Sequence, residues 1–270
     1  MTVRFYQFDG ALQASDARMD ERAFCYGDGF FSTIGVHDGQ MLWADGHRVR
    51  VIAGLGALKM VLDIDGLMAQ LHTLAAAITE GLIKIIITRA PQSVRGYGYR
   101  GGDSRATAYI KCQAMPVYQA HQWQDGLPIA MPVDMICLDS QIAHRPPRLA
   151  GLKLIACPDQ VLAHAELLAR QDQGATDGLV ANVHGQYICA TMGNVFYQID
   201  GAWYTPPVNL SGVAGVMRAQ VLTSDYFGHI SERVLMQGDL SAIQAMFITN
   251  AVRGIIPVWR LDGRVLDQFV

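Results

Sequence analysis

The stretch RLAGLKLIAC, residues 148–157, places one lysine inside an apolar run. Lys153 is preceded by Leu152 and followed by Leu154 and Ile155. Burial in such a run removes the hydration of an ammonium group and favours its neutral form. Two interpretations follow. The side chain reaches water with its stem buried, or its amine is a nucleophile of the kind that forms Schiff bases.

The composition indicates a protein with a large core and no polyanionic partner. The chain has 270 residues, of which 51% are hydrophobic and 17% charged, so it can form two domains or one large one. Its formal net charge is -3, and no block of lysines and arginines stands out. We therefore expect no nucleic-acid partner.

Other features predict a cytoplasmic protein without a metal. The first ten residues, MTVRFYQFDG, lack the apolar core of a signal peptide, and no apolar run is long enough to span a bilayer. We therefore expect no membrane association. The histidines and cysteines show no zinc-site spacing. The cysteines are odd in number and contain no CxxC pair, as is typical of a reducing compartment: Cys25, Cys112, Cys137, Cys157 and Cys189.

Apolar patterning divides the chain into two parts. We predict a smaller α+β domain over residues 1–115, a linker over 116–126 that contains Pro116, and a larger β-rich domain over 127–270 that carries Lys153. The N-terminal part is expected to contain strands at 3–8, 30–36, 83–88 and 107–115 and helices at 45–62 and 65–79. Asp65 is the expected cap of the second helix, and Asp38-Gly39 is typical of a hairpin turn.

The C-terminal part is expected to contain more strands, at 127–131, 179–183, 186–190, 195–199, 246–249 and 255–261. Residues 149–156 are expected to be a strand or an extended segment. A helix begins at Pro158, and its expected buried face is formed by Val161, Leu162, Ala165, Leu168 and Ala169. The fold class is therefore α+β or mixed α/β, in two domains.

Two stretches have the features of an anion site. SGVAGVMR, residues 211–218, is a glycine-rich turn that leads into a helix, where free N–H groups and the helix dipole suit a phosphate. DGHRVR, residues 45–50, places His47 and Arg50 one turn apart, and an arginine there can fork onto a phosphate. A plain helix start and a solvated helix face remain the alternative interpretations.

Two glycine-rich loops are further candidates. CYGDGFFSTIGV, residues 25–36, precedes an apolar strand and is either a pocket-lining loop or a simple tight turn. RAPQSVRGYGYRGG, residues 89–102, contains three arginines and two tyrosines. It is either a loop that covers a site and holds a substrate carboxylate, or a surface loop.

Taken together and in order, these stretches resemble the fold-type IV pyridoxal-phosphate enzymes of the branched-chain aminotransferase-like superfamily. The resemblance is closest to the aminodeoxychorismate lyases. It extends from about residue 26 to residue 258 and is carried by YGDGFFST, HRVRV, TRAPQSVRGY, AGLKLIACPDQVL, TDGLV, CATMGNVF, YTPPVNLSGVAGVMR and TNAVRGIIPV. No one of these motifs is decisive, but eight of them in the same order are specific.

The resemblance implies a two-domain fold like that of D-amino-acid aminotransferase, with pyridoxal 5'-phosphate as cofactor. It implies a homodimeric lyase that converts 4-amino-4-deoxychorismate to 4-aminobenzoate and pyruvate in folate biosynthesis. Lys153 would form the Schiff base and act as the catalytic base. The other implied contacts are Arg50 and the backbone of Val216 and Met217 with the phosphate, Asn194 and Asn250 with the cofactor, and Thr33, Arg95 and Tyr97 with the substrate.

The chain departs from the family pattern near the cofactor. Cys189 lies five residues before Asn194, where the family has a glutamate that pairs with the ring nitrogen of the cofactor. That partner tunes the cofactor as an electron acceptor. The family's His-Leu-Asn-Arg after the lysine is replaced by residues 154–157, LIAC. Two alternatives to a lyase follow: a branched-chain or D-amino-acid transaminase, or a protein of this fold with weakened or lost catalysis.

Overall fold

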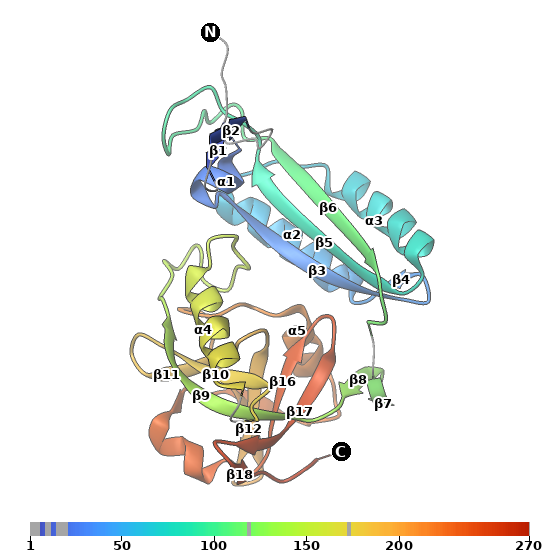
Figure 1. Ribbon diagram of the computed structural model, residues 1–270. Helices are drawn as coiled ribbons and strands as arrows, with labels where there is room; N and C mark the ends of the chain where they lie inside the picture. Colours follow the sequence, from blue (N-terminus) through green and yellow to red (C-terminus); the bar gives the residue numbers. More distant parts are fainter. Residues whose placement is uncertain (1–5, 9–11, 15–20, 118–119, 172–173, 270) are drawn as a thin grey trace.

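The computed structural model describes the chain except for residues 1–5, 9–11, 15–20, 118–119, 172–173 and 270. Its main features are a four-stranded sheet formed by the N-terminal part and a twelve-stranded sheet formed by the C-terminal part (Figure 1). The expected α+β class is confirmed. Two short elements precede the first sheet, a two-stranded ribbon of β1 (Tyr6–Phe8) and β2 (Leu12–Ala14) and the helix α1 (Arg22–Tyr26). Part of the strand predicted at 3–8 lies outside the described residues.

The smaller sheet is antiparallel, in the order β4-β3-β5-β6. Its strands are β3 (Gly29–His37), β4 (Gln40–Met41), β5 (Gly81–Arg89) and β6 (Ala106–Ala114). The predicted hairpin turn is present, because Asp38 and Gly39 have φ values of 48° and 72°.

Helices α2 (Ala44–Leu58) and α3 (Ile64–Ile78) cover one face of this sheet (Figure 1). The helix predicted to reach residue 62 ends earlier, because Lys59 adopts a left-handed conformation. The predicted cap is also wrong. The side chain of Asp63, and not that of Asp65, accepts the hydrogen bond from the N–H of Gly66.

The larger sheet closes on itself. Pairings β9–β10, β10–β11, β11–β12, β12–β16, β16–β17 and β17–β9 form a ring of strands around an apolar core. The ring strands are β9 (Val133–Ile142), β10 (Asp177–Asn182), β11 (Gln186–Ala190), β12 (Asn194–Ile199), β16 (Met246–Asn250) and β17 (Gly254–Leu261). Ring closure brings the ends of β11, β12 and β16 together.

The remaining elements extend or cover this ring. They are the strands β7 (Ala120–Gln124), β8 (Leu127–Ala130), β13 (Ala202–Thr205), β14 (Ile230–Glu232), β15 (Leu235–Met236) and β18 (Arg264–Val265), the helices α4 (Pro158–Ala169) and α5 (Val216–Thr223), and the 3-10 helix η2 (Gln237–Ala242). The stretch expected to be a linker therefore contains a strand, β7, which pairs with β8.

The predicted buried face of α4 is wrong. Val161 and Leu162 are each 65% exposed, whereas Ala163 and Leu167 are buried. The carboxylate of Glu166 accepts hydrogen bonds from two backbone N–H groups of β9, which turns this side of the helix toward the sheet. The helix carries apolar residues on two faces, so periodicity alone did not identify the buried one.

An extended segment joins the two sheets and carries Lys153. The carbonyl of Lys153 accepts a hydrogen bond from the N–H of Phe31 at 2.9 Å, and Gly151 accepts one from Ala214 at 2.8 Å. This segment has isolated bridges in place of a regular strand, in agreement with the prediction of an extended stretch. Separately, none of the described helices has the length and apolar character needed to cross a lipid bilayer.

Candidate functional site

A cavity of about 520 Å³ lies where the two sheets meet. Its wall is built from β3, the segment around residue 153, the facing ends of β11 and β12, the start of α5 and the turn after β16. Eight of the predicted site residues line it: Thr33, Arg50, Lys153, Cys189, Asn194, Val216, Met217 and Asn250. Residues more than 200 positions apart in the sequence therefore contribute to one site.

The amine of Lys153 is poised to lose its proton near neutral pH. Its Nζ lies 4.7 Å from the centre of the Phe31 ring. Burial, followed by repulsion from Arg50, lowers the pKa of Lys153 from 10.5 to about 8. A sizeable fraction of the amine is therefore unprotonated at physiological pH, as a nucleophile or a general base requires.

Arg50 is held in the cavity wall by two hydrogen bonds. It donates to the hydroxyl of Ser32 at 3.2 Å and to the carbonyl of Ala214 at 3.1 Å. Burial lowers the pKa of Arg50 to about 10, so it remains a cation at neutral pH. Arg50 and the turn 211–218 were named from the sequence as two candidates for one phosphate site. The structure places Arg50 against residue 214 of that turn.

His47 supports Arg50 and does not face the cavity. Its side chain is fully buried, and its Nδ1 lies 2.8 Å from the Ser32 hydroxyl. Burial, followed by the charge of Arg50, lowers the pKa of His47 to about 3, so the ring is neutral. The Ser32 hydroxyl thus accepts from Arg50 and shares a second hydrogen bond with Nδ1 of His47.

The first turn of α5 offers backbone N–H groups to the cavity. No side chain caps this turn at Gly215, and Val216 and Met217 line the cavity. A Cβ atom at Gly215 would collide with Oδ1 of Asn194, so a larger residue there requires that side chain to move. Asn194 itself donates to the carbonyl of Val213 at 2.8 Å, which fixes the turn that precedes the helix.

Thr249 was missed by the sequence analysis. It is 1% exposed, lines the cavity, and its hydroxyl has no hydrogen-bond partner in the described part of the chain. An unpaired buried hydroxyl is costly unless a ligand completes it. With Arg50 and the uncapped start of α5, it forms the donor set that a phosphate requires. Thr249 opens the quoted stretch TNAVRGIIPV, but the sequence analysis assigned no role to its hydroxyl.

A neutral thiol lies in another part of the wall. Cys189 is buried, and desolvation raises its pKa to about 11, so the thiol is protonated at neutral pH. Gln160 was also missed by the sequence analysis. Its Nε2 lies 3.4 Å from the sulfur, and its buried Oε1 has no partner among the described residues. No carboxylate occupies this position.

Arg95 and Tyr97, two predicted substrate contacts, do not line this cavity. Tyr97 is 85% exposed and packs on the ring of Tyr26 at 5.2 Å between centroids. Its carbonyl accepts a hydrogen bond from Arg22. Arg95 lines a separate depression beside Arg22 and Tyr26. Within one chain, the loop 89–102 therefore lies away from Lys153.

Asp28, in the first glycine-rich loop, has a structural role. Its carboxylate pairs with Arg22 at 2.6 Å and with Arg89 at 3.0 Å, and both arginines are almost fully buried. Of the two interpretations of this loop, the simple tight turn therefore applies to the part around Asp28. Phe31 and Thr33, further along the same stretch, line the cavity, as a pocket loop would.

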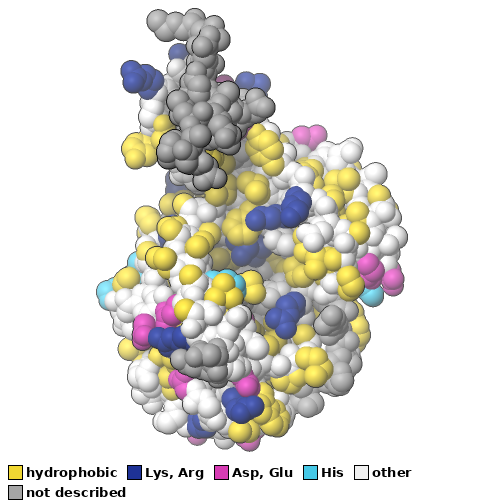
Figure 2. All heavy atoms as spheres, in the orientation of Figure 1, with side chains coloured by type: hydrophobic (Ala, Val, Ile, Leu, Met, Phe, Trp, Pro, Cys, Tyr) yellow, Lys and Arg dark blue, Asp and Glu magenta, His cyan; other side chains and the backbone are white. Residues whose placement is uncertain are grey.

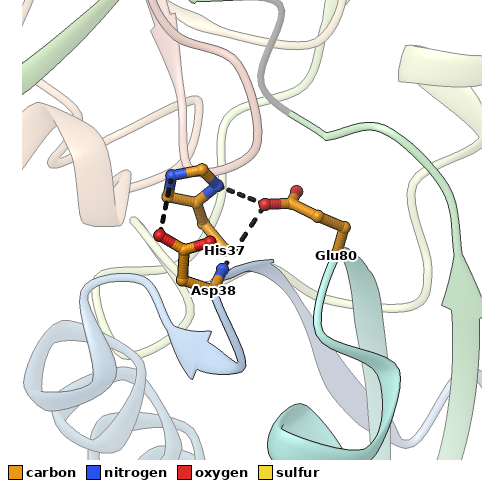
Figure 3. A group of neighbouring side chains, drawn as sticks. All are labelled: His37, Asp38 and Glu80. Atoms are coloured by element: carbon orange, nitrogen blue, oxygen red, sulfur yellow. Dashed lines mark hydrogen bonds and ion pairs between the residues drawn. The ribbon is translucent and has the colours of Figure 1, made fainter.

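A second polar cluster lies at the far end of β3, where His37, Asp38 and Glu80 come together (Figure 3). One ring nitrogen of His37 contacts Glu80, and the other lies 3.7 Å from Asp38. One ion cannot bind both ring nitrogens of a histidine, because they point in different directions. Asp38 is also 87% exposed at its side chain, so the cluster is a polar group at the surface.

Comparisons with known proteins agree with this geometry. The family model described as amino-transferase class IV matches residues 29–261. The chain is 31% identical to an aminodeoxychorismate lyase of Vibrio harveyi, with 92% of this chain and 88% of that protein covered. It is 26% identical to a putative branched-chain-amino-acid aminotransferase of Methanocaldococcus jannaschii, covering 98% and 90%.

Among solved structures, the crystal structure of 4-amino-4-deoxychorismate lyase from Pseudomonas aeruginosa superimposes with a TM-score of 0.79 at 30% identity. The match covers 94% of this chain and 90% of that one. The ring of strands and the smaller sheet are therefore both features that this chain shares with a known enzyme.

Proposed function

The chain belongs to the amino-transferase class IV family, and from this premise we propose that it is a pyridoxal-phosphate-dependent lyase. Its substrate in this proposal is 4-amino-4-deoxychorismate, and its products are 4-aminobenzoate, a folate precursor, and pyruvate. The proposal is supported by relatives with that name at 30% and 31% identity over almost the whole chain. The single observation that carries it is the amine of Lys153 inside the cavity, with its lowered pKa.

The residues of the cavity fit pyridoxal 5'-phosphate. Arg50, the hydroxyl of Thr249 and the N–H groups at the start of α5 would hold the phosphate. Lys153 would hold the aldehyde carbon. When bound, this group supplies an electron-accepting ring next to the substrate amine. The cofactor would therefore give a partner to the Thr249 hydroxyl, which has none among the described residues, and its aldehyde would lie next to the reactive amine of Lys153.

In this proposal Lys153 transfers one proton and no other residue of the chain needs to react. Its neutral Nζ removes the proton from the substrate ring carbon that bears nitrogen. The carbon–oxygen bond to the enolpyruvyl group breaks, and the protonated amine returns the proton to the methylene carbon of that group. The ring becomes aromatic, pyruvate leaves, and no water or oxidant enters the balance. Arg50 is a cation at neutral pH and would hold the phosphate of the cofactor.

A transaminase is the second candidate, because a relative at 26% identity bears that name. The protonated thiol of Cys189 favours the lyase. Transamination needs a strong electron acceptor, which a carboxylate next to the ring nitrogen promotes and a neutral thiol does not. Elimination that ends in an aromatic product is strongly favourable and depends less on that acceptor. The weak acceptor also permits the third possibility, a protein that binds the cofactor with little turnover.

The test is the visible absorbance of the purified protein with added cofactor. We expect a band in the wild type, its loss in Lys153→Ala, and its retention in Lys84→Met. Lys84 is a matched control, because its Nζ lies 4.9 Å from the same Phe31 ring but the residue does not line the cavity. Formation of 4-aminobenzoate and pyruvate from the substrate then identifies the lyase. Conversion of the bound cofactor to its amine form by an amino acid would identify a transaminase instead.

We further propose a homodimer in the cytoplasm. Val161, Leu162 and Leu168 leave an apolar face of α4 exposed, and such faces are typical of subunit contacts. Arg95 and Tyr97 could then reach a substrate only by movement of their loop or from a second copy. No disulfide joins any of the five cysteines, all of which lie in the described part of the chain, and this agrees with a reducing compartment. Light scattering of the wild type and of Leu162→Glu tests the dimer, which the charge should weaken.

A further inference from the structure

The cavity wall carries more positive than negative charge. Arg50, Arg145, Lys153 and Arg253 all line it, and Asp159 is the only acidic residue that does so in the described part of the chain. Figure 2 shows lysine and arginine side chains beside and within the recess between the two parts of the molecule. A cavity of this composition attracts anions.

Three of these cations already have a function or a partner. Arg50 is bonded to Ser32 and to residue 214 beside the phosphate site, and Lys153 supplies the reactive amine. Arg145 donates to the carbonyl of Ala156 at 2.9 Å and lies 3.8 Å from Asp159. Their charges are thus used by the cofactor or compensated by the protein.

Arg253 is different, because its guanidinium has no ion pair and no hydrogen bond within the described residues. The backbone beneath it is nevertheless fixed. The carboxamide of Asn250 accepts hydrogen bonds from the N–H groups of Val252 at 3.0 Å and of Arg253 at 2.8 Å. Gly254, with φ 75°, packs so closely on Pro128 that a Cβ atom would collide with it. A fixed turn therefore places Arg253, whose side chain has no charge partner among the described residues, in the wall of the cavity.

We propose that Arg253 binds a carboxylate of the substrate and thereby selects acidic substrates. The inference rests on the proposed function, since 4-amino-4-deoxychorismate carries two carboxylates. One remains on 4-aminobenzoate and the other leaves with pyruvate. An arginine can bind either one through two parallel hydrogen bonds. This assignment gives Asn250 a second task, that of holding the turn on which Arg253 lies.

The experiment compares acids with neutral analogues on the cofactor-loaded protein. Calorimetry measures the binding of 4-aminobenzoate against its methyl ester and of pyruvate against pyruvamide. The variants are Arg253→Met, Arg253→Lys and the control Arg260→Met. Arg260 pairs with Asp134 on the other end of β17 and does not line the cavity. The cofactor absorbance is recorded for each variant and should be the same in all, which separates the role of Arg253 from cofactor binding.

We expect Arg253→Met to weaken the binding of at least one acid roughly 10- to 100-fold, as for loss of a hydrogen bond to a charged group. Its neutral analogue should bind as tightly as it does to the wild type. Arg253→Lys should recover part of the loss, and Arg260→Met should behave as wild type. With substrate, Arg253→Met should raise KM by a similar factor and change kcat much less.

The proposal is overturned if Arg253→Met binds both acids as tightly as the wild type does. It is also overturned if the wild type binds the acids no more tightly than their neutral analogues. Failure of the lyase proposal would look different. The wild type would then release neither product from 4-amino-4-deoxychorismate, while the binding comparison would still decide the role of Arg253.

Discussion

Replacing Lys153 by Met in the cofactor-free protein should make the protein more stable at neutral pH. The folded state lowers the pKa of this amine from 10.5 to about 8. Each pKa unit corresponds to about 1.4 kcal/mol, so the charged lysine destabilises the folded state by up to about 3 kcal/mol at pH 7. Methionine has a similar length and no charge, and it avoids this penalty.

Because folding lowers the pKa of Lys153, the stability cost of this residue depends on pH in a defined direction. Well below pH 8 the amine is charged in both folded and unfolded chains, and the full penalty applies. Between pH 8 and 10.5 the unfolded chain binds more protons, so the wild type gains stability as the pH rises. The advantage of Lys153→Met should therefore fall from about 3 kcal/mol at pH 7 to about 1.5 kcal/mol at pH 9.5.

Urea denaturation of both proteins at the two pH values measures this change. Other titrating groups largely cancel, because they are present in both proteins. Lys153→Gln is the control, since it differs from Lys153→Met in packing but should show the same change with pH. A stability difference that is equal at pH 7 and 9.5 would mean that the amine is well hydrated in the folded protein, and the argument for a reactive lysine would lose its basis.

Three other substitutions test the rest of the site. Cys189→Glu should increase conversion of the bound cofactor to its amine form by amino acids, measured by absorbance, because a carboxylate strengthens the electron acceptor; no increase would contradict a location near the ring nitrogen. Thr249→Val should weaken cofactor binding roughly 5- to 30-fold, by about 1 to 2 kcal/mol, in a titration, yet leave the cofactor-free protein equally stable or more so. Gly215→Ala should lower the unfolding midpoint by several degrees in a thermal melt, because the new Cβ atom displaces Asn194; an unchanged midpoint would show that the turn can adapt.

Local signals in the sequence predicted most of the fold. The continuous apolar run of β5 and the turn dipeptide after β3 are formed by neighbouring residues, so their structure could be inferred without the rest of the chain. β9 was not predicted, since its pairings with β10 and β17 are parallel and join residues far apart in sequence. The buried face of α4 depends on the sheet beneath it, which periodicity does not reveal.

In the candidate site, too, some residues were identified from the sequence and others only from the fold. Residues within recognisable motifs, such as Lys153 and Arg50, were found. Thr249 and Gln160 lie inside two of the quoted motifs, but they were identified only when the fold placed their side chains at the cavity without a complete set of hydrogen-bond partners among the described residues. Arg95 was placed near the substrate by the composition of its loop and by the resemblance, and one chain does not bring it there.

The charges in the cavity connect the stability of this protein with its function. Arg50 and Lys153 both have lowered pKa values because the cavity removes their water, and the charge of Arg50 further disfavours the charged form of Lys153. Neither has an acidic partner among the described residues, so folding alone does not compensate them. In the proposed site, an anion between Arg50 and α5 would remove this imbalance and would give the Thr249 hydroxyl a partner. The features that destabilise the empty protein are therefore the same ones that the proposal assigns to phosphate binding and to the reactive amine, as expected of a site selected for activity over stability.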